Sequence, residues 1–119
     1  MKKLRVILSL LIALLGLAHM CFTPVFYPGW TLDSLWFAST GIALIFMGLA
    51  NYLLIGRNET WLRICGAVAN FSMLTILAMV AVIIGGAPHA LVGVALALGL
   101  FVAAAVDGPK GGNADGINK

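Results

Sequence analysis

Residues 4–22 read LRVILSLLIALLGLAHMCF, and Arg5 is the one charged side chain in this run. At a rise of about 1.5 Å per residue, a helix of this length crosses a hydrocarbon core about 30 Å thick. The residue before a proline is pushed out of the α region, so Thr23-Pro24 predicts the end of the helix. The run therefore predicts a transmembrane helix close to the start of the chain.

Three more apolar runs follow, and residues typical of helix ends separate them. Thr31 precedes the second run and is a favourable N-cap, Gly56 follows that run, and Gly85-Gly86 closes the third. The last residues are rich in Gly, Asn and Asp, with almost nothing to bury, which predicts a flexible tail. The predicted spans are about 4–22, 32–55, 61–85 and 88–106, and the predicted tail is 107–119.

The overall composition agrees with a membrane protein. Of 119 residues, 62% are hydrophobic and 9% charged, and the mean hydropathy is +1.09. Soluble globular domains have about 25% charged residues, so the composition excludes a soluble domain, a disordered chain and a free-standing nucleic-acid binder. We predict an all-α polytopic membrane protein, folded as an antiparallel bundle of four transmembrane helices.

The basic residues predict the orientation of these helices. The loops 23–30 and 85–89 contain no Lys or Arg, whereas the opposite ends of the spans carry all of them. Because cytoplasmic loops are enriched in Lys and Arg, both termini are predicted to face the cytoplasm. The basic residues on that side are Lys2, Lys3, Arg5, Arg57, Arg63, Lys110 and Lys119.

Small residues predict where the helices approach each other closely. Lipid provides no hydrophobic reason for helices to associate, so transmembrane contacts favour small side chains and paired polar groups. Small-residue faces of this kind occur on the first and fourth spans. They are Ser9, Ala13, Gly16 and Met20 in the first span, and Gly93 with Ala97 and Gly99 with Ala103 in the fourth.

The second span has one face that is richer in polar residues. At 100° per residue, Asp33, Trp36, Thr40, Met47 and Asn51 fall on one side of the helix. An unsatisfied polar group in hydrocarbon costs several kcal/mol. This side is therefore predicted to face the interior of the bundle.

Two asparagines and two threonines allow two interpretations. Asn51 and Asn70 differ in depth by about 7 Å on the rise per residue and need not touch. They are either polar groups that hold helices together or, with Thr40 and Thr75, the lining of a slot. Such a slot would bind a lipophilic ligand with a polar head, such as a lipid, a quinone or an isoprenoid.

A second candidate site lies near the outer boundary of the membrane. It comprises His19 at the end of the first span, Asp33 at the start of the second and His89 at the start of the fourth. Imidazole and carboxylate groups bind divalent metals, and two histidines from different helices can also bracket a haem iron. The alternative is that both histidines are half-hydrated interface residues and that Asp33 is a helix-start acid.

Ionisable residues are missing from the middle of every predicted span. Proton-coupled small multidrug pumps carry a glutamate in the middle of their first helix, whereas residues 10–15 of this chain read LLIALL. The sequence also lacks a phosphate-binding glycine loop, a nucleophile elbow and a paired-cysteine motif. These absences favour a non-enzymatic protein.

The first span carries residues 4–8, LRVIL, then residues 14–19, LLGLAH, followed by an aromatic residue and Pro24. This order resembles the opening of DoxX-like proteins, which are small four-helix bacterial membrane proteins. The resemblance covers residues 1–25 and the general pattern of spans, and it carries over no catalytic residue. It implies the bacterial inner (plasma) membrane and, as in some relatives, a role as a subunit of a quinone-linked redox complex.

Three functions are compatible with these patterns. The first is a non-enzymatic accessory or interaction subunit that binds a lipid or quinone between its helices. The second is a minimal dimeric transporter of a neutral or lipophilic solute, working through the polar side of the second span. The third is a redox subunit that holds haem or a metal ion at the outer histidines. Membrane lipids and either a second copy of the chain or a larger membrane complex are the expected partners.

Overall fold

The computed structural model describes residues 2–57 and 59–106, and all its regular secondary structure is helical. Each helix is long and apolar enough to cross a membrane, so the prediction of an all-α chain with four candidate spans is confirmed. Asn58 and the predicted tail at 107–119 lie outside the described residues. The helices are α1 (Lys2–Phe26), α2 (Leu32–Leu53), α3 (Thr60–Ile83) and α4 (Pro88–Val106).

Helix α1 continues through Thr23-Pro24, so the predicted end at this dipeptide is wrong. Proline removes one backbone donor, but here it lies in the last turn, where few helical hydrogen bonds remain to be lost. The Thr23 hydroxyl donates to the carbonyl of His19 at 2.8 Å, and the Tyr27 N–H donates to the carbonyl of Thr23 at 3.0 Å. These bonds maintain the helix beyond the proline.

The other predicted helix ends are mostly in place. Thr31 caps α2 through a reciprocal capping box, in which its hydroxyl accepts from the Ser34 N–H at 3.1 Å and its own N–H donates to Ser34 Oγ at 2.9 Å. After α3, Gly85 and Gly86 have φ values of 69° and 75°, which glycine adopts without steric cost. The Gly86 N–H then donates to the carbonyl of Ala81 at 2.7 Å, which closes the helix end.

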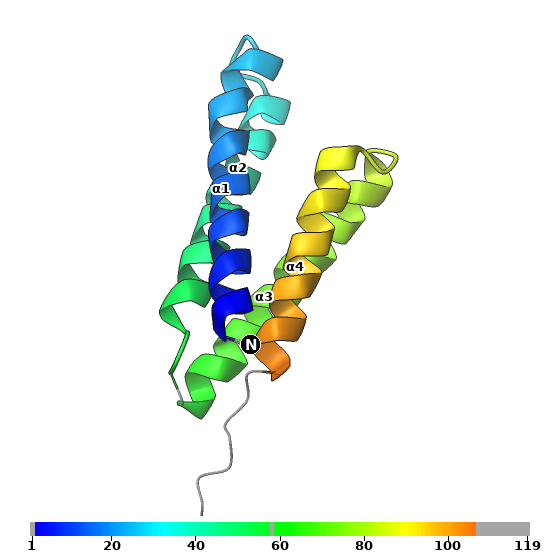
Figure 1. The fold of residues 1–119 in the computed structure, drawn as a ribbon. Helices are drawn as coiled ribbons and strands as arrows, with labels where there is room; N and C mark the ends of the chain where they lie inside the picture. The colour runs from blue at the N-terminus through cyan, green and yellow to red at the C-terminus, as the bar shows by residue number, and fades with distance from the viewer. Residues whose placement is uncertain (1, 58, 107–119) are drawn as a thin grey trace, which may run out of the picture.

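The four helices are arranged as two hairpins (Figure 1). Helices α1 and α2 form the most extensive contact in the molecule, and α3 with α4 forms the next. Contacts between the hairpins are fewer, mainly between α1 and α4, with little between α2 and α3. In Figure 1 the hairpins are close together at the end where α1 begins and diverge toward the other end.

The contact between α1 and α2 depends on glycine, as the small-residue face of the first span predicts. A Cβ atom added to Gly16 would lie 2.5 Å from the carbonyl oxygen of Gly41, and one added to Gly48 would lie 2.5 Å from that of Ser9. Both distances are shorter than any real Cβ contact, so the two backbones touch directly. Ser9 and Gly16 are buried on α1, and Gly41 and Gly48 are buried on α2.

The small residues of α4 face α1 and the interior. Gly93, Ala97 and Ala103 are buried, and a Cβ on Gly93 would lie 3.8 Å from Leu15. A Cβ on Gly99 would lie 3.5 Å from Leu8, which is also on α1. Both small-residue pairs of this helix are therefore used within the chain.

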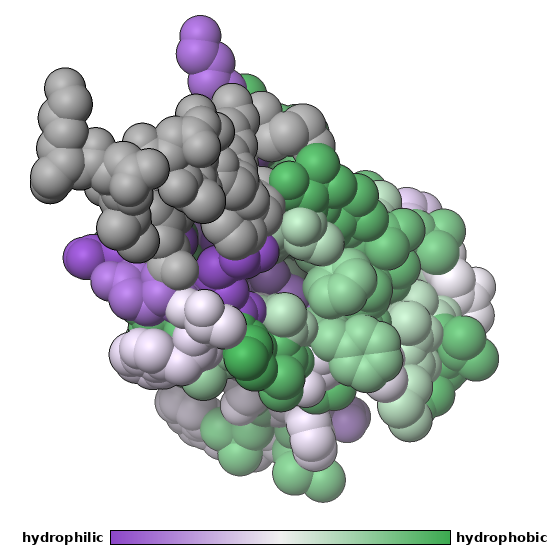
Figure 2. All heavy atoms as spheres, turned by 90° about the horizontal axis from the view of Figure 1, so that it is seen from below, coloured by the Kyte–Doolittle hydropathy of each residue, from purple (hydrophilic) through white to green (hydrophobic). Residues whose placement is uncertain are grey.

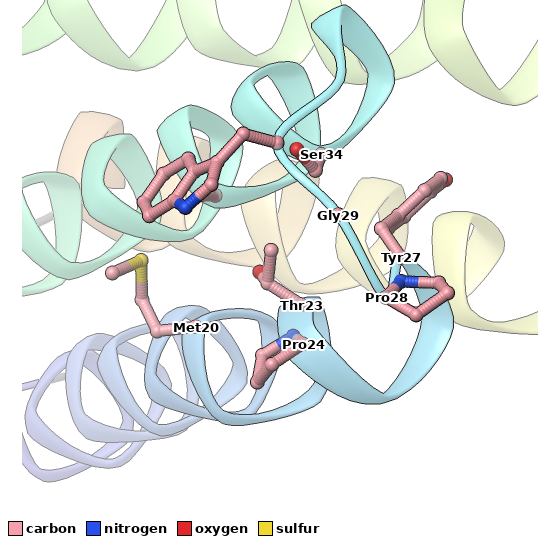
Figure 3. Close-up of a pocket in the computed structure, with 9 residues that line it drawn as sticks. Met20, Thr23, Pro24, Tyr27, Pro28, Gly29 and Ser34 are labelled. Carbon is pink, nitrogen blue, oxygen red and sulfur yellow. The ribbon is translucent and has the colours of Figure 1, made fainter.

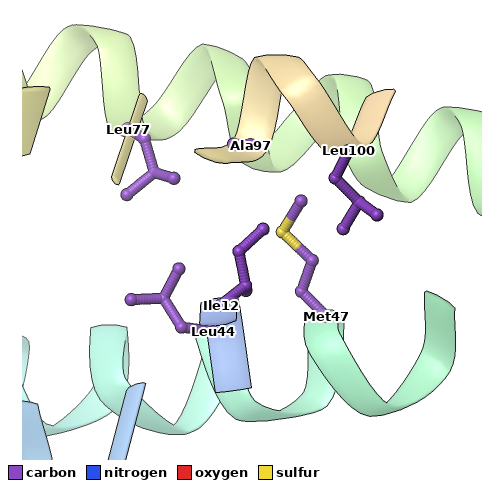
Figure 4. Close-up of a cluster of buried hydrophobic side chains, with 6 residues drawn as sticks. All are labelled: Ile12, Leu44, Met47, Leu77, Ala97 and Leu100. Carbon is purple, nitrogen blue, oxygen red and sulfur yellow. The ribbon is translucent and has the colours of Figure 1, made fainter. Parts of the chain in front are cut away.

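A cluster of apolar side chains joins the hairpins at mid-height (Figure 4). All four helices contribute to it, and Ile12 on α1 and Leu100 on α4 are both completely buried. Lipid does not drive transmembrane helices together, so the van der Waals contacts within this cluster help to hold the two hairpins against each other. The cluster consists of Ile12, Leu44, Met47, Leu77, Ala97 and Leu100.

The predicted polar face of α2 is buried only in the C-terminal half of the helix. Met47 and Asn51 are buried, whereas Asp33 is exposed and Trp36 is 67% exposed. The prediction is therefore wrong for the N-terminal half of the helix. The reason is that α2 packs chiefly on α1 through Gly41 and Gly48, and these glycines set which side of the helix is covered.

Candidate functional site

Asn51 and Asn70 form a direct amide pair between α2 and α3. Asn51 Nδ2 donates to Asn70 Oδ1 at 2.6 Å, Asn70 Nδ2 donates to Asn51 Oδ1 at 2.9 Å, and Asn51 Nδ2 also donates to the carbonyl of Met47 at 3.0 Å. The residues are 2% and 1% exposed. The expectation that they need not touch is wrong, because it compared depths along parallel helices and the two hairpins are inclined to each other.

The two threonines predicted to share a slot with this pair do not join it. The Thr40 hydroxyl donates to the carbonyl of Trp36 at 3.0 Å, and the Thr75 hydroxyl donates to that of Phe71 at 2.9 Å. Each bond lies within the threonine's own helix. Thr75 is exposed, and neither threonine lines either of the two cavities described below. This geometry favours a structural role for the asparagine pair.

The outer histidines lie beside each other, one from each hairpin. Their ring centroids are 6.3 Å apart, and His19 also stacks on Phe37 of α2 at 4.6 Å. His19 Nδ1 lies 3.0 Å from the carbonyl oxygen of Leu15, which can only accept, so Nδ1 is the donor in this contact. The pair therefore places two imidazoles, from α1 and α4, in the contact between the hairpins.

The third residue of the predicted metal site is not gathered with them. Asp33 is exposed in the first turn of α2. Within residues 2–57 and 59–106, no group of three His, Cys, Asp or Glu side chains is placed to hold a metal ion. The structure thus brings His19 and His89 together without Asp33.

An apolar groove of about 450 Å³ lies at the end of the first hairpin where α1 leads into α2 (Figure 3). It is formed by the last turns of α1, the following loop and the start of α2. The hydroxyls of Thr23 and Ser34 both donate to backbone carbonyls, those of His19 and Thr31. The groove therefore presents mainly apolar and aromatic surface. Its lining residues are Met20, Thr23, Pro24, Tyr27, Pro28, Gly29, Trp30, Ser34 and Ala38.

A smaller cavity of about 130 Å³ lies at the end of the molecule where α1 and α3 begin and the two hairpins meet. All four helices or their caps contribute to it, and its wall combines two arginines and an amide with apolar side chains. We call this space the inner cavity. Its lining residues are Arg5, Leu54, Arg63, Gly66, Ala67, Asn70, Phe101, Ala104 and Ala105.

The charge of the inner cavity comes from two helices. Arg5 on α1 is only 8% exposed, and Arg63 in the first turns of α3 is half-buried. In the part of the chain that the structure describes, the lining contains no Asp or Glu. Figure 2, which looks onto this end of the molecule, shows hydrophilic residues gathered there beside apolar flanks. The inner cavity therefore has two arginines in its wall, at the edge of an apolar body.

Sequence reasoning used Arg5 as a signal of orientation alone and so missed its place in this cavity. One signal was available for Arg5. It lies four residues before Ser9, and Arg5, Ser9, Ile12 and Gly16 follow each other at helical spacing along the buried side of α1. A basic residue on the same side as a small-residue face is a candidate for an inward-facing charge.

Comparison of this chain with protein-family models, with curated proteins and with solved structures finds no match. The geometry of the cavities and of the polar pairs is therefore the basis for assigning a function.

Proposed function

We propose that this chain is a non-enzymatic integral membrane protein that acts as an accessory subunit and retains a lipid between its helices. The observation that carries this proposal is the inner cavity, which is lined by residues from α1, α3 and α4 and by the C-cap of α2. A ligand held there contacts both hairpins at once. It would therefore stabilise their junction, where the direct helix contacts are fewest.

The chemistry of the inner cavity suits an amphipathic ligand. Leu54, Phe101 and Ala104 supply apolar surface, while Arg5 and Arg63 supply charge at the end of the spans. A lipid combines the same two properties, with apolar chains beside a polar head. The apolar outer surfaces of the helices continue from this site and can accommodate the chains or a partner helix.

We further propose an antiparallel bundle with both termini in the cytoplasm of a bacterium. Lys2, Lys3 and Arg57 are exposed at the same end of the molecule as the two cavity arginines, whereas residues 84–87 and 27–31 carry no basic residue. The positive-inside rule then orients this end toward the cytoplasm. The resemblance of the first span to DoxX-like proteins supports the inner membrane as its location.

Cysteine labelling tests this orientation. The two native cysteines, Cys21 and Cys65, are replaced by alanine, and single cysteines are introduced by Gly29→Cys or Glu59→Cys. A Cβ at Gly29 meets no atom within 4 Å, and Glu59 makes no side-chain capping bond, so both changes should be tolerated. We expect a membrane-impermeant maleimide to label the Gly29→Cys variant in intact spheroplasts and the Glu59→Cys variant only after lysis. The reverse pattern would place the termini outside.

Native mass spectrometry of the purified full chain tests lipid retention. The protein is extracted in a mild detergent from the membrane in which it is produced, and the detergent is removed from the ions in the gas phase. We expect a population that carries the mass of a bound phospholipid, because a ligand that contacts both hairpins leaves slowly. A protein that is strictly monomeric and carries no lipid at any detergent concentration would contradict the proposal.

A redox subunit is the second candidate, favoured by the closeness of His19 and His89. Two histidines from different helices can bracket a haem iron. The same purified sample distinguishes this function from lipid retention. A redox subunit would show a Soret absorption band, or a stoichiometric metal, that is lost in a His89→Ala variant, whereas the lipid-retaining protein would show neither.

A further inference from the structure

We propose that His19 and His89 together bind one divalent transition-metal ion, which links the two hairpins and exchanges with the surrounding solution. The proposal does not depend on lipid retention. It also differs from the redox subunit considered above, whose haem or metal would be found in the purified sample. Three observations support it: the spacing of the two rings, the anchoring of one of them and the position of both in the fold.

The spacing of the two rings suits one shared metal ion. Imidazole nitrogen binds zinc at about 2.0–2.1 Å, and the ring centroid lies about 1.2 Å behind that nitrogen, so two imidazoles on opposite sides of one ion have centroids about 6.5 Å apart. The centroids of His19 and His89 are 6.3 Å apart. Imidazole also suits Cu²⁺ and Ni²⁺, whose square-planar or tetragonal geometry provides such opposite positions. The helices therefore need not move to share an ion.

His19 is held in the way that is usual for a metal ligand. Its Nδ1 donates to the carbonyl of Leu15 at 3.0 Å, and its ring stacks on Phe37 with centroids 4.6 Å apart. Metal-binding histidines almost always donate their other ring N–H to a carboxylate, a backbone carbonyl or water, which fixes the orientation of the ring. In the neutral ring, Nε2 then carries the lone pair that binds a metal.

His89 supplies the second ligand and can adjust to the ion. It is the second residue of α4 and is exposed, so its ring can turn without displacing a packed neighbour. The two rings meet edge to face, with 65° between their planes. A turn of His89 alone therefore directs its nitrogen at an ion bound to the fixed ring of His19.

The position of the pair gives the ion a structural effect. His19 lies on α1 and His89 on α4, and these two helices make most of the contact between the hairpins. Toward the end where α4 begins, the hairpins diverge (Figure 1). An ion bound to both rings would hold the hairpins together on this diverging side.

Two protein ligands make this a weak site. Structural zinc sites have four protein ligands and catalytic zinc sites have three. In residues 2–57 and 59–106, no third His, Cys, Asp or Glu side chain is placed to complete such a set. Water then fills the remaining positions of the ion. We therefore expect the ion to exchange freely and to be lost during purification unless it is added back.

Titration with Ni²⁺ tests the assignment. The full chain carries Cys21→Ala and Cys65→Ala, because both thiols are exposed and can bind metals themselves, and it is purified through a tag that contains no histidine. His19 and His89 are then the only histidines in the sample. Calorimetry should give one ion per chain. At about 100 times the measured dissociation constant, Ni²⁺ should lower the equilibrium constant of unfolding about 100-fold, measured by circular dichroism in mixed micelles.

The His89→Gln variant should lose both the binding and the stabilisation, because one imidazole alone cannot link the hairpins. The matched control is Asp33→Asn, which removes an exposed carboxylate in the first turn of α2 that is not gathered with the histidines. It should change the dissociation constant by less than about twofold. Mg²⁺, which prefers oxygen ligands, should not stabilise the chain.

Electron paramagnetic resonance with Cu²⁺ gives a result that does not depend on the stability of the His89→Gln variant. One equivalent of Cu²⁺ is added to the same cysteine-free chain. We expect hyperfine coupling to two imidazole nitrogens, because each histidine supplies one. Coupling to a single nitrogen would overturn the shared site.

Other outcomes would overturn the proposal in different ways. Unchanged Ni²⁺ binding in His89→Gln would place the ion elsewhere, and equal stabilisation by Mg²⁺ would show a non-specific effect of divalent charge. One ion for every two chains would show a bridge between copies instead of between hairpins. Equal losses in Asp33→Asn and His89→Gln would show that the carboxylate is a third ligand. None of these results bears on lipid retention, which is measured separately.

Discussion

Replacing Gly16 with alanine is expected to lower the free energy of unfolding by about 3 kcal/mol. The new methyl group would lie 2.5 Å from the carbonyl oxygen of Gly41 and 2.8 Å from the backbone nitrogen of Ile45. Both obstacles are backbone atoms of α2, which cannot rotate away as a side chain does. Relief of the overlap requires α1 and α2 to separate, with loss of the closest contact in the molecule. Gly48→Ala is expected to behave in the same way, because its methyl group would meet the backbone of Ser9 at 2.5 Å.

Gly93→Ala is the matched control for these substitutions. It is also a buried glycine in the middle of a helix, but its new methyl group would meet Leu15 at 3.8 Å and Leu77 at 3.9 Å, which are ordinary contacts. Alanine is also favoured over glycine inside a helix by about 1 kcal/mol. We expect this variant to be as stable as the original chain or slightly more so. Unfolding in mixed micelles, followed by circular dichroism, measures all three variants, and equal destabilisation of all three would refute the close approach.

Replacing Asn51 with leucine is expected to lower the free energy of unfolding by about 2 kcal/mol. The substitution leaves the amide of Asn70, which is 1% exposed, without its hydrogen-bond partner. Asn70→Leu should cost less, because Asn51 still donates to the carbonyl of Met47. The double variant should be less destabilised than the sum of the single variants by about 1 kcal/mol, since neither amide is then left alone.

The double-mutant cycle also separates the two interpretations of the asparagines. Thr75→Val serves as the control. Thr75 is exposed and lies on α3, the helix that carries Asn70, and its hydroxyl donates to the carbonyl of Phe71 within that helix. It should change stability by less than about 0.5 kcal/mol. A structural pair gives the coupling described above. Additive single effects, accompanied by loss of a lipophilic ligand, would instead favour a slot that includes the asparagines.

Local patterns were sufficient to predict the helices and many of their ends. The capping box at Thr31 and the turn at Gly85-Gly86 are encoded by residues that act within a few positions of each other. The predicted helix end at Thr23-Pro24 was wrong because hydrogen bonds from the Thr23 hydroxyl and the Tyr27 N–H compensate for the proline. The glycine contact of α1 was also predictable, because close approach requires small residues whatever the partner helix is.

Sequence patterns predicted the candidate site much less well than they predicted the helices. His19 and His89 were singled out and do lie together, but Asp33 does not join them. Arg5 was interpreted only as a signal of orientation, although it is buried at the inner cavity. A residue's type and spacing predict which face of its own helix it occupies. They do not predict which other helix covers that face.

The sequence by itself determined that the chain forms four apolar helices, and it predicted which of their ends share a side of the membrane. Span length, capping residues and the distribution of Lys and Arg act locally, so no knowledge of packing was needed. Only the tertiary structure decided that Asn51 bonds to Asn70 and that Arg5 and Arg63 line one cavity. These pairings depend on the tilt and rotation of one hairpin against the other. Contacts between side chains far apart in the chain set the tilt and rotation. The periodicity of residues within a single helix does not predict these contacts.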